Sequence, residues 1–169
     1  MQASKVRLEL ALSSDASSIA HLSRTQIEQG LPWSWRVERV SSALRSPDTV
    51  VLVARCSIGV AGFAIMYFGD EQAHLNLLAV RPEWRRQGIG RSLLQWLETS
   101  AVVAGISVIY LEMRSRNQDA LVFYQRLGFR PVQQLVGYYG GRESAIRLAK
   151  DLWERPRTRA NNKGSSDVE

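Results

Sequence analysis

Cysteine and histidine are scarce in this chain, and their scarcity excludes several kinds of protein. Only one of the 169 residues is cysteine, Cys56, so no internal disulfide can form, and a reducing compartment, the cytoplasm, is the expected location. The two histidines, His21 and His74, share no metal-ligand spacing with each other or with Cys56. We therefore expect no bound metal, and we interpret Cys56 as a small packing residue.

Long apolar runs are also absent. The first thirty residues contain no stretch that is typical of a signal peptide or a membrane span, so no membrane partner is expected. With 45% hydrophobic residues the chain can still build one packed core. We predict a single domain over residues 1–153. The tail, residues 154–169, has almost no apolar residues, and this composition predicts disorder.

Basic residues outnumber acidic ones, 22 against 16, which gives a formal net charge of +6. Such a surface can attract nucleic acid, an acidic protein or an anionic cofactor. The arginines form no long run, but four of them cluster around one loop: Arg81, Arg85, Arg86 and Arg91. We interpret this cluster as a localised anion site and do not expect nucleic-acid binding as the main function. The sequence leaves homodimer formation open.

Strand-like and helical segments alternate along the chain. Their periodicity and turn residues predict strands at 6–12, 50–54, 60–68, 74–80, 108–113, 129–139 and 143–148, and helices at 15–30, 37–44, 88–104 and 118–127. This order predicts a mixed α/β sheet with helices on its faces.

A glycine-rich loop, Arg85-Arg86-Gln87-Gly88-Ile89-Gly90, lies between the strand at 74–80 and the helix that follows. Glycines at alternate positions let the backbone turn tightly, and the helix start supplies unpaired N–H groups and a positive dipole end. We expect a diphosphate to bind there. A plain turn before a helix is the alternative. A Rossmann site would need glycine in place of Leu93, and a P-loop would need Gly-Lys-Ser/Thr.

This loop and a second block of residues resemble the GNAT superfamily of N-acetyltransferases. The first block runs from Leu77 to Leu94 and contains the pattern Arg/Gln-x-x-Gly-x-Gly/Ala. The second block consists of Leu111-Glu112-Met113-Arg114, Asn117, Ala120, Phe123-Tyr124 and Gly128-Phe129. Close similarity covers residues 74–150. Within the superfamily, the bacterial ribosomal-protein-alanine N-acetyltransferases are the most similar branch.

The resemblance implies a fold and a co-substrate. The fold is a mixed, mostly antiparallel central sheet of about seven strands with helices on both faces, and the co-substrate is acetyl-CoA. The strand backbone at Leu78, Ala79 and Val80 is expected to contact the pantetheine arm, and Asn117 is expected to contact the cofactor near the following helix. The expected pyrophosphate contacts are Arg85, Arg86, Gln87, Gly88, Ile89, Gly90 and Arg91.

Acetyl transfer to an amine requires a general base for the amine and a general acid for the departing thiolate. The resemblance implies that Tyr124 is the acid; the alternative is a core tyrosine. It also implies that Glu112 is the base; the alternative is a structural carboxylate paired with Arg114 or Arg130. We expect the Glu112 side chain to be exposed on one sheet face.

His74 is a second candidate base, because imidazole has a suitable intrinsic pKa. Simple alternation along its strand puts His74 on the same face as Asn76, Leu78 and Val80. The alternative is a histidine with a purely structural role on the strand.

The acceptor is predicted from the last hairpin and from two tryptophans. Tyr138 and Tyr139 resemble the tyrosines that flank the acceptor peptide in protein N-terminal acetyltransferases; the alternative is hairpin packing. Trp33 and Trp35 are candidates for lining a pocket for a small amine. We therefore expect acetylation of a protein N-terminal α-amine, with a small-molecule amine, or a non-catalytic acyl-CoA sensor, as alternatives.

Overall fold

The structure, a computed structural model, describes residues 5–154 of the chain. The predicted disordered tail, residues 154–169, lies outside these residues except for Glu154. A single seven-stranded sheet with the strand order β1-β2-β3-β4-β5-β7-β6 forms the centre of the described part. All neighbouring strands are antiparallel except β4 and β5. The predicted fold class is therefore confirmed.

Most elements lie within a few residues of their predicted positions, but the helix predicted at 15–30 ends as an α-helix at Leu22 and continues only to Ile27, as a π-helical turn. The strands are β1 (Arg7–Leu10), β2 (Thr49–Cys56), β3 (Gly59–Phe68), β4 (Gln72–Val80), β5 (Val108–Arg114), β6 (Arg130–Tyr139) and β7 (Glu143–Asp151). The helices are α1 (Ala16–Leu22), α2 (Val37–Arg45), α3 (Ile89–Val103) and α4 (Gln118–Arg126). Three short helical turns are η1 (Ser13–Asp15), the π-helical η2 (Ser23–Ile27) and η3 (Pro82–Trp84). None of the described helices is long and apolar enough to cross a membrane.

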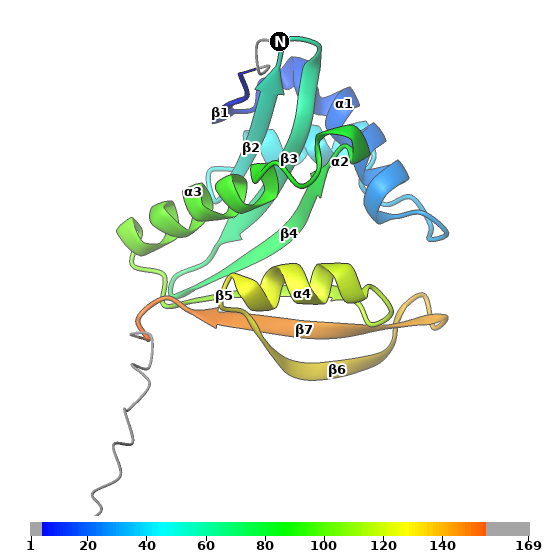
Figure 1. Cartoon of the computed structure of the whole chain (residues 1–169), viewed down its shortest axis with the longest axis vertical. Coiled ribbons are helices and arrows are strands. Elements are labelled where there is room, and N and C mark those ends of the chain that lie inside the picture. Colours follow the sequence, from blue (N-terminus) through cyan, green and yellow to red (C-terminus); the bar gives the residue numbers. More distant parts are fainter. Residues whose placement is uncertain (1–4, 155–169) are drawn as a thin grey trace, which may run out of the picture.

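The helices cover the two faces of the sheet with two separate apolar cores (Figure 1). On one face, Leu93 and Leu97 of α3 and Tyr124 of α4 belong to the larger core. On the other face, Ile19 of α1 and Val40 of α2 pack against β2 and β3. This second pair of helices therefore covers the sheet half that contains β1 to β4.

The parallel strands β4 and β5 pair over only a short stretch. Residues 72–74 of β4 pair with residues 108–110 of β5, and the strands then separate, as Figure 1 shows. From Leu75 to Val80, β4 keeps β3 as its partner on one side, while its other side faces the opening between the two halves of the sheet.

A β-bulge interrupts β4 inside this separation. Met66 of β3 pairs with Leu75 and Ile65 pairs with Leu77, so Asn76 is an extra residue in β4. Because a bulge shifts the alternation by one residue, side chains before and after it change faces.

The change of face is visible in the two cores. Leu75 packs in the core under α3 and α4, whereas Leu77 packs in the core under α1 and α2. His74 therefore lies on the face opposite to that of Leu78 and Val80. The expectation that simple alternation puts these residues on one face is wrong, because the bulge at Asn76 intervenes.

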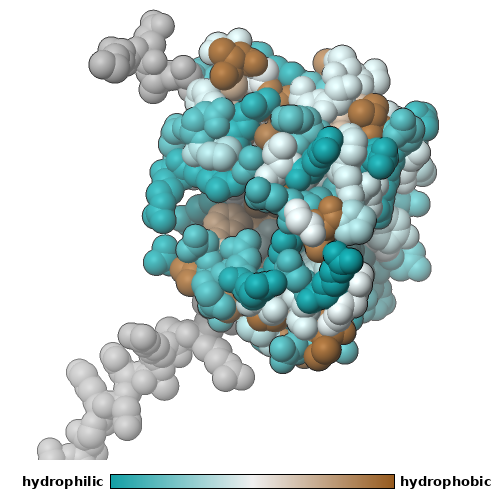
Figure 2. All heavy atoms as spheres, turned by 90° about the vertical axis from the view of Figure 1, so that its right-hand side faces the viewer, coloured by the Kyte–Doolittle hydropathy of each residue, from teal (hydrophilic) through white to brown (hydrophobic). Residues whose placement is uncertain are grey.

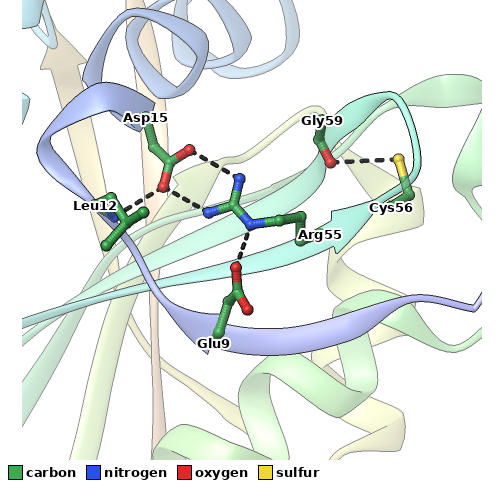
Figure 3. Close-up of polar contacts among 6 residues, drawn as sticks. All are labelled: Glu9, Leu12, Asp15, Arg55, Cys56 and Gly59. Atoms are coloured by element: carbon green, nitrogen blue, oxygen red, sulfur yellow. Dashed lines mark hydrogen bonds and ion pairs between the residues drawn. The ribbon is translucent and has the colours of Figure 1, made fainter.

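Arg55 of β2 joins the N-terminal elements to the sheet (Figure 3). Its guanidinium pairs with Glu9 of β1 and makes two bonds, of 3.1 and 2.8 Å, to the Asp15 carboxylate. Asp15 also accepts a bond from the Leu12 amide at 2.8 Å and does not cap α1 with its side chain. Burial raises the pKa of Asp15, but the bonds from Arg55 and Leu12 outweigh it and leave that pKa below its ordinary value.

Cys56 follows Arg55 at the end of β2. Its side chain is buried in the larger core, and its thiol donates to the Gly59 carbonyl at 3.3 Å (Figure 3). This position agrees with the interpretation of Cys56 as a small packing residue.

Candidate active site

A cavity of about 690 Å³ opens where β4 and β5 separate. Its walls come from the segment between α1 and α2 (residues 23–36, the α1–α2 segment), from α2, β4, β5 and α4, and from the end of β6 with the turn after it. Figure 2, which views the molecule from this side, shows the hollow with hydrophobic atoms at its floor. His74, Glu112 and Tyr124 all line this cavity, so the structure brings the three predicted catalytic residues together.

Glu112 is held between two basic side chains. Its Oε1 accepts bonds of 2.9 Å from Arg147, and its Oε2 is hydrogen-bonded to His74 Nε2. Arg147 stands directly opposite Glu112 in the β5–β7 pair. The Glu112 side chain is only 7% exposed, so the expectation of an exposed carboxylate is wrong.

In the alternative interpretation, Glu112 is a structural carboxylate that pairs with Arg114 or Arg130. Neither arginine is its partner. Arg130 pairs with Glu154, and Arg114 is bonded to other groups. The register of β7 against β5 decides the pairing, because it sets Arg147 opposite Glu112.

The two candidate bases form a single hydrogen-bonded pair. Burial raises the pKa of Glu112, but the hydrogen bond and charge of His74 and the ion pair with Arg147 outweigh it and lower that pKa. Asn76 Nδ2 lies 3.1 Å from His74 Nδ1. Both ring nitrogens of His74 therefore have a polar neighbour, Asn76 at Nδ1 and Glu112 at Nε2. The carboxylate is ionised at neutral pH.

A second cavity, of about 1170 Å³, lies over β5, β7 and β6, and His74 and Glu112 line it as well. The His74 side chain is 36% exposed. The pair therefore borders both cavities, and the imidazole is in contact with solvent.

Tyr124 reaches the first cavity from α4. Its ring packs edge-to-face against Phe123 and Phe129, with centroid distances of 5.0 and 5.6 Å, and the residue is 8% exposed. Burial, with a smaller contribution from Tyr139, raises the pKa of Tyr124. The phenol therefore keeps its proton at neutral pH and is available as a hydrogen-bond donor.

The predicted acceptor residues divide between the cavity and its surroundings. Tyr138 and Tyr139 line it and form an edge-to-face pair at 5.0 Å, and burial raises the pKa of Tyr139 to about 12. Trp35 lines the cavity too. Trp33 does not: its ring lies against two arginine side chains, and its indole N–H is buried without a partner among residues 5–154.

Two residues that sequence reasoning missed shape the cavity wall. The buried Glu28 carboxylate accepts bonds from the Ser23 hydroxyl (3.0 Å) and from the backbone amides of Ser34 (2.8 Å) and Trp35 (3.2 Å), and so it holds the α1–α2 segment. Glu28 lies within the helix predicted at 15–30, and nothing in that helical pattern indicates that its carboxylate is buried.

Arg114, at the end of β5, is the second missed residue. It donates to the carbonyls of Ile27 (3.0 Å) and Gln29 (2.5 Å) and lies 3.3 Å from the Glu143 carboxylate. One side chain thus ties the α1–α2 segment to the start of β7. Its place in the Leu-Glu-Met-Arg block is visible in the sequence, but its bonds to the α1–α2 segment are not.

The glycine-rich loop has the backbone of an anion site. Arg86 has φ 58° and Gly88, the residue before α3, has φ 79°. No side chain caps α3, so its first N–H groups are free of side-chain partners. Successive amides in such a turn form an anion-binding concavity.

Not every predicted cofactor contact lies at that concavity. Arg85 donates to the Gln26 side chain (2.7 Å) and to the Val80 carbonyl (3.0 Å), so its side chain braces the loop against the α1–α2 segment. Leu78 and Asn117 line the first cavity, and Asn117 also caps α4.

Comparison with known proteins assigns a family to this site. A family model described as an acetyltransferase (GNAT) domain matches residues 47–131, half of the chain. The chain belongs to the GNAT acetyltransferase family. This membership confirms the superfamily that the sequence blocks predicted.

Individual GNAT relatives agree with the predicted branch. A [ribosomal protein bS18]-alanine N-acetyltransferase of Escherichia coli (strain K12) is 38% identical over 93 residues, which are 53% of this chain and 63% of the relative. The match therefore spans less than two thirds of that relative. An N-alpha-acetyltransferase of Sulfurisphaera tokodaii is 28% identical and is covered over 93% of its length, with 86% of this chain.

One solved structure extends the similarity to the fold. The crystal structure of the ribosomal-protein-S18-alanine N-acetyltransferase from Escherichia coli superposes with a TM-score of 0.76 at 27% identity. The superposition covers 90% of this chain and 97% of the Escherichia coli enzyme's chain.

Proposed function

We propose that this protein is an acetyl-CoA-dependent N-acetyltransferase whose acceptor is the α-amine of a protein N-terminus. The observation that carries the proposal is the meeting of the Glu112–His74 pair, Tyr124 and the tyrosines 138 and 139 in one cavity. That cavity lies at the strand separation, and β4, which lines it, leads along the chain into the glycine-rich loop. The similarity to N-terminal acetyltransferases supports the same acceptor class.

The residues around the loop fit acetyl-CoA. The left-handed backbone at Arg86 and Gly88, together with the uncapped start of α3, suits a diphosphate. At Gly90 a Cβ atom would lie 3.3 Å from the Phe123 ring, so glycine allows the loop to approach α4. The separated edge of β4 offers backbone groups to the amides of a pantetheine arm. When bound, acetyl-CoA supplies an acetyl thioester.

Glu112 and His74 act as the base in this proposal. The ionised carboxylate orients the imidazole through Nε2, and the pair accepts the proton that the acceptor ammonium must lose, directly or through one water. The second cavity then gives His74 a route to release that proton. Tyr124 keeps its phenolic proton until the thiolate leaves and then donates it.

The strength of this base favours an α-amine over a lysine side chain. A carboxylate whose pKa is lowered is a weak base. A protein α-amine has an ordinary pKa of about 8, whereas a lysine amine has one of about 10.4, so the α-amine loses its proton far more readily. A weak base therefore suffices for an N-terminus.

A panel of acceptors tests the proposal. Thiol release from acetyl-CoA is followed with peptides that carry free N-termini, with N-terminally blocked lysine peptides and with small primary amines. We expect turnover with the free N-termini alone. Turnover confined to small amines would show that the acceptor is a small molecule and not a protein N-terminus. Intact acetyl-CoA binding with no turnover across the panel would favour an acyl-CoA sensor.

We further propose that the protein works in the cytoplasm. The single, buried thiol of Cys56 supports a reducing compartment. Fractionation of cells that produce the full chain tests the location, and recovery from an oxidising compartment would contradict it.

A further inference from the structure

The charged side chains that line the first cavity are, with one exception, fully engaged by protein partners. Glu28 accepts bonds from the α1–α2 segment, Glu112 pairs with His74 and Arg147, and Arg114 is bonded to Glu143 and two carbonyls. These pairs leave no free charge for a ligand in that part of the wall.

Arg39 of α2 is the exception. It lines the cavity, its side chain is exposed, and it has no acidic partner among the residues that the structure describes. Its guanidinium carbon lies 4.1 Å from the centroid of the Trp35 ring, a cation–π stack that orients the planar group. The N–H donors at the edge of a stacked guanidinium remain available to a carboxylate.

The Trp35 side chain, on which Arg39 stacks, is held in place by its own contacts. The backbone amide of Trp35 donates to the buried Glu28 carboxylate, and Trp35 packs against the core under α1 and α2. The indole therefore presents Arg39 from a rigid wall, which lowers the cost of ordering a long side chain on binding.

The anion that Arg39 faces is not the diphosphate of the cofactor. The cavity that Arg39 lines contains Tyr138 and Tyr139 but, among residues 5–154, none of the loop residues 85–91. The guanidinium therefore lies away from the glycine-rich loop, in the cavity that the two tyrosines line. A carboxylate in the acceptor gives the planar, two-oxygen partner that a guanidinium binds best.

We propose that Arg39 binds a carboxylate side chain near the N-terminus of the acceptor, so that the preferred acceptors are N-terminal peptides with Asp or Glu shortly after the reacting residue. This inference rests on the proposed function and adds the chemical class of its acceptor. The selection acts through attraction at the cavity wall and not through the catalytic groups.

Matched peptides test the assignment. Three series carry Glu, Gln or Lys at the second, third or fourth position of an otherwise constant, uncharged sequence with a free N-terminus. For one position we expect kcat/KM for Glu to exceed that for Gln by about fivefold, the range of a well-oriented, partly exposed ion pair, and Lys to be the poorest. The preference should shrink as salt rises, because exposed charges are screened.

Variants of Arg39 test whether its guanidinium causes the preference for Glu peptides. R39M should bring the Glu and Gln peptides within about twofold of each other, and R39E should reverse the order so that Lys becomes the best peptide. R36M is the matched control, because Arg36 stacks on Trp33 outside the cavity and its loss should leave the preference unchanged. Equal use of Glu and Gln peptides by the parent, or a preference that survives R39M, overturns the proposal.

The same peptides are also titrated by equilibrium binding in the presence of CoA. If no peptide is turned over, the proposed function fails, and the binding order still decides whether Arg39 selects a carboxylate. If all peptides are turned over and bound alike, the proposed function stands and the role of Arg39 is contradicted.

Discussion

The His74 imidazole and the Glu112 carboxylate are hydrogen-bonded at the point where β4 and β5 separate. Two residues that compete as the general base when only the sequence is considered thus form one unit. Arg147 completes it from β7, and His74 and Arg147 together hold the pKa of the carboxylate below its ordinary value. The sheet builds this unit from three strands that are far apart in the sequence.

A double-mutant cycle tests the unit. We expect Glu112→Gln to lower kcat about 100-fold, the low end for removing a general base. His74→Gln should lower kcat as well, and the double variant should lose about as much as E112Q alone, because residues that act as one unit are not additive. Steady-state kinetics on a free N-terminal peptide measure it, with the exposed Glu38→Gln as control. Additive losses would show two independent groups.

Tyr124→Phe tests the general acid. The phenol is the group that keeps its proton at neutral pH, so its removal should lower turnover at least about tenfold while the ring continues to pack against Phe129. Acetyl-CoA affinity should stay within about twofold of the parent. Tyr67→Phe, at an exposed tyrosine, is the control. Equal turnover in the Y124F variant and the parent would remove the phenol from the mechanism.

Gly88→Asp tests the anion site. The substitution puts a carboxylate against the diphosphate at a residue with φ 79°, and we expect acetyl-CoA binding to be lost. Gly105→Asp is a matched control, because Gly105 has φ 81° and follows the other end of α3. Equilibrium binding of acetyl-CoA to both variants separates backbone strain from charge. Retained affinity in G88D would mean that the loop does not hold the diphosphate.

Arg55→Met tests the N-terminal ion pairs. Loss of charge-assisted bonds to a largely buried carboxylate should lower the free energy of unfolding by about 1.5 to 3 kcal/mol, measured in urea. Arg126→Met, at an exposed arginine of α4, should change it little. An R55M variant as stable as the parent would show that the network in Figure 3 adds nothing.

The same network predicts a pH dependence. The pKa of Asp15 is lower in the folded protein than in the unfolded chain, where it is about 3.9. The stabilisation is therefore complete above the unfolded value and is lost as the pH falls through the lower, folded value. Urea unfolding at a series of acidic pH values should show a smaller difference between R55M and the parent at the lowest pH.

The sequence predicted the elements and the family because these depend on local patterns. The glycines of the loop, the block that contains Glu112 and Tyr124, and the periodicity of the helices are all visible along the chain. The bulge at Asn76 is not, because a bulge is defined by pairing with β3. It reversed the face assigned to Leu78 relative to His74.

Cross-strand partners were equally hidden from the sequence. Arg147 reaches Glu112 only because of the β5–β7 register, and no spacing along the chain distinguishes it from Arg130. Likewise, Trp33 and Trp35 are two positions apart in the sequence, yet of the two only Trp35 lines the cavity. Tertiary packing decides such cases.

The central claim is transfer of an acetyl group to a protein α-amine, and one peptide tests it most directly. The peptide has a free N-terminus and one internal lysine, and it is incubated with acetyl-CoA and the full chain. Fragmentation by mass spectrometry then locates the added acetyl group. The account predicts acetylation at the N-terminal amine alone, and acetylation at the lysine side chain, or at neither amine, would contradict it.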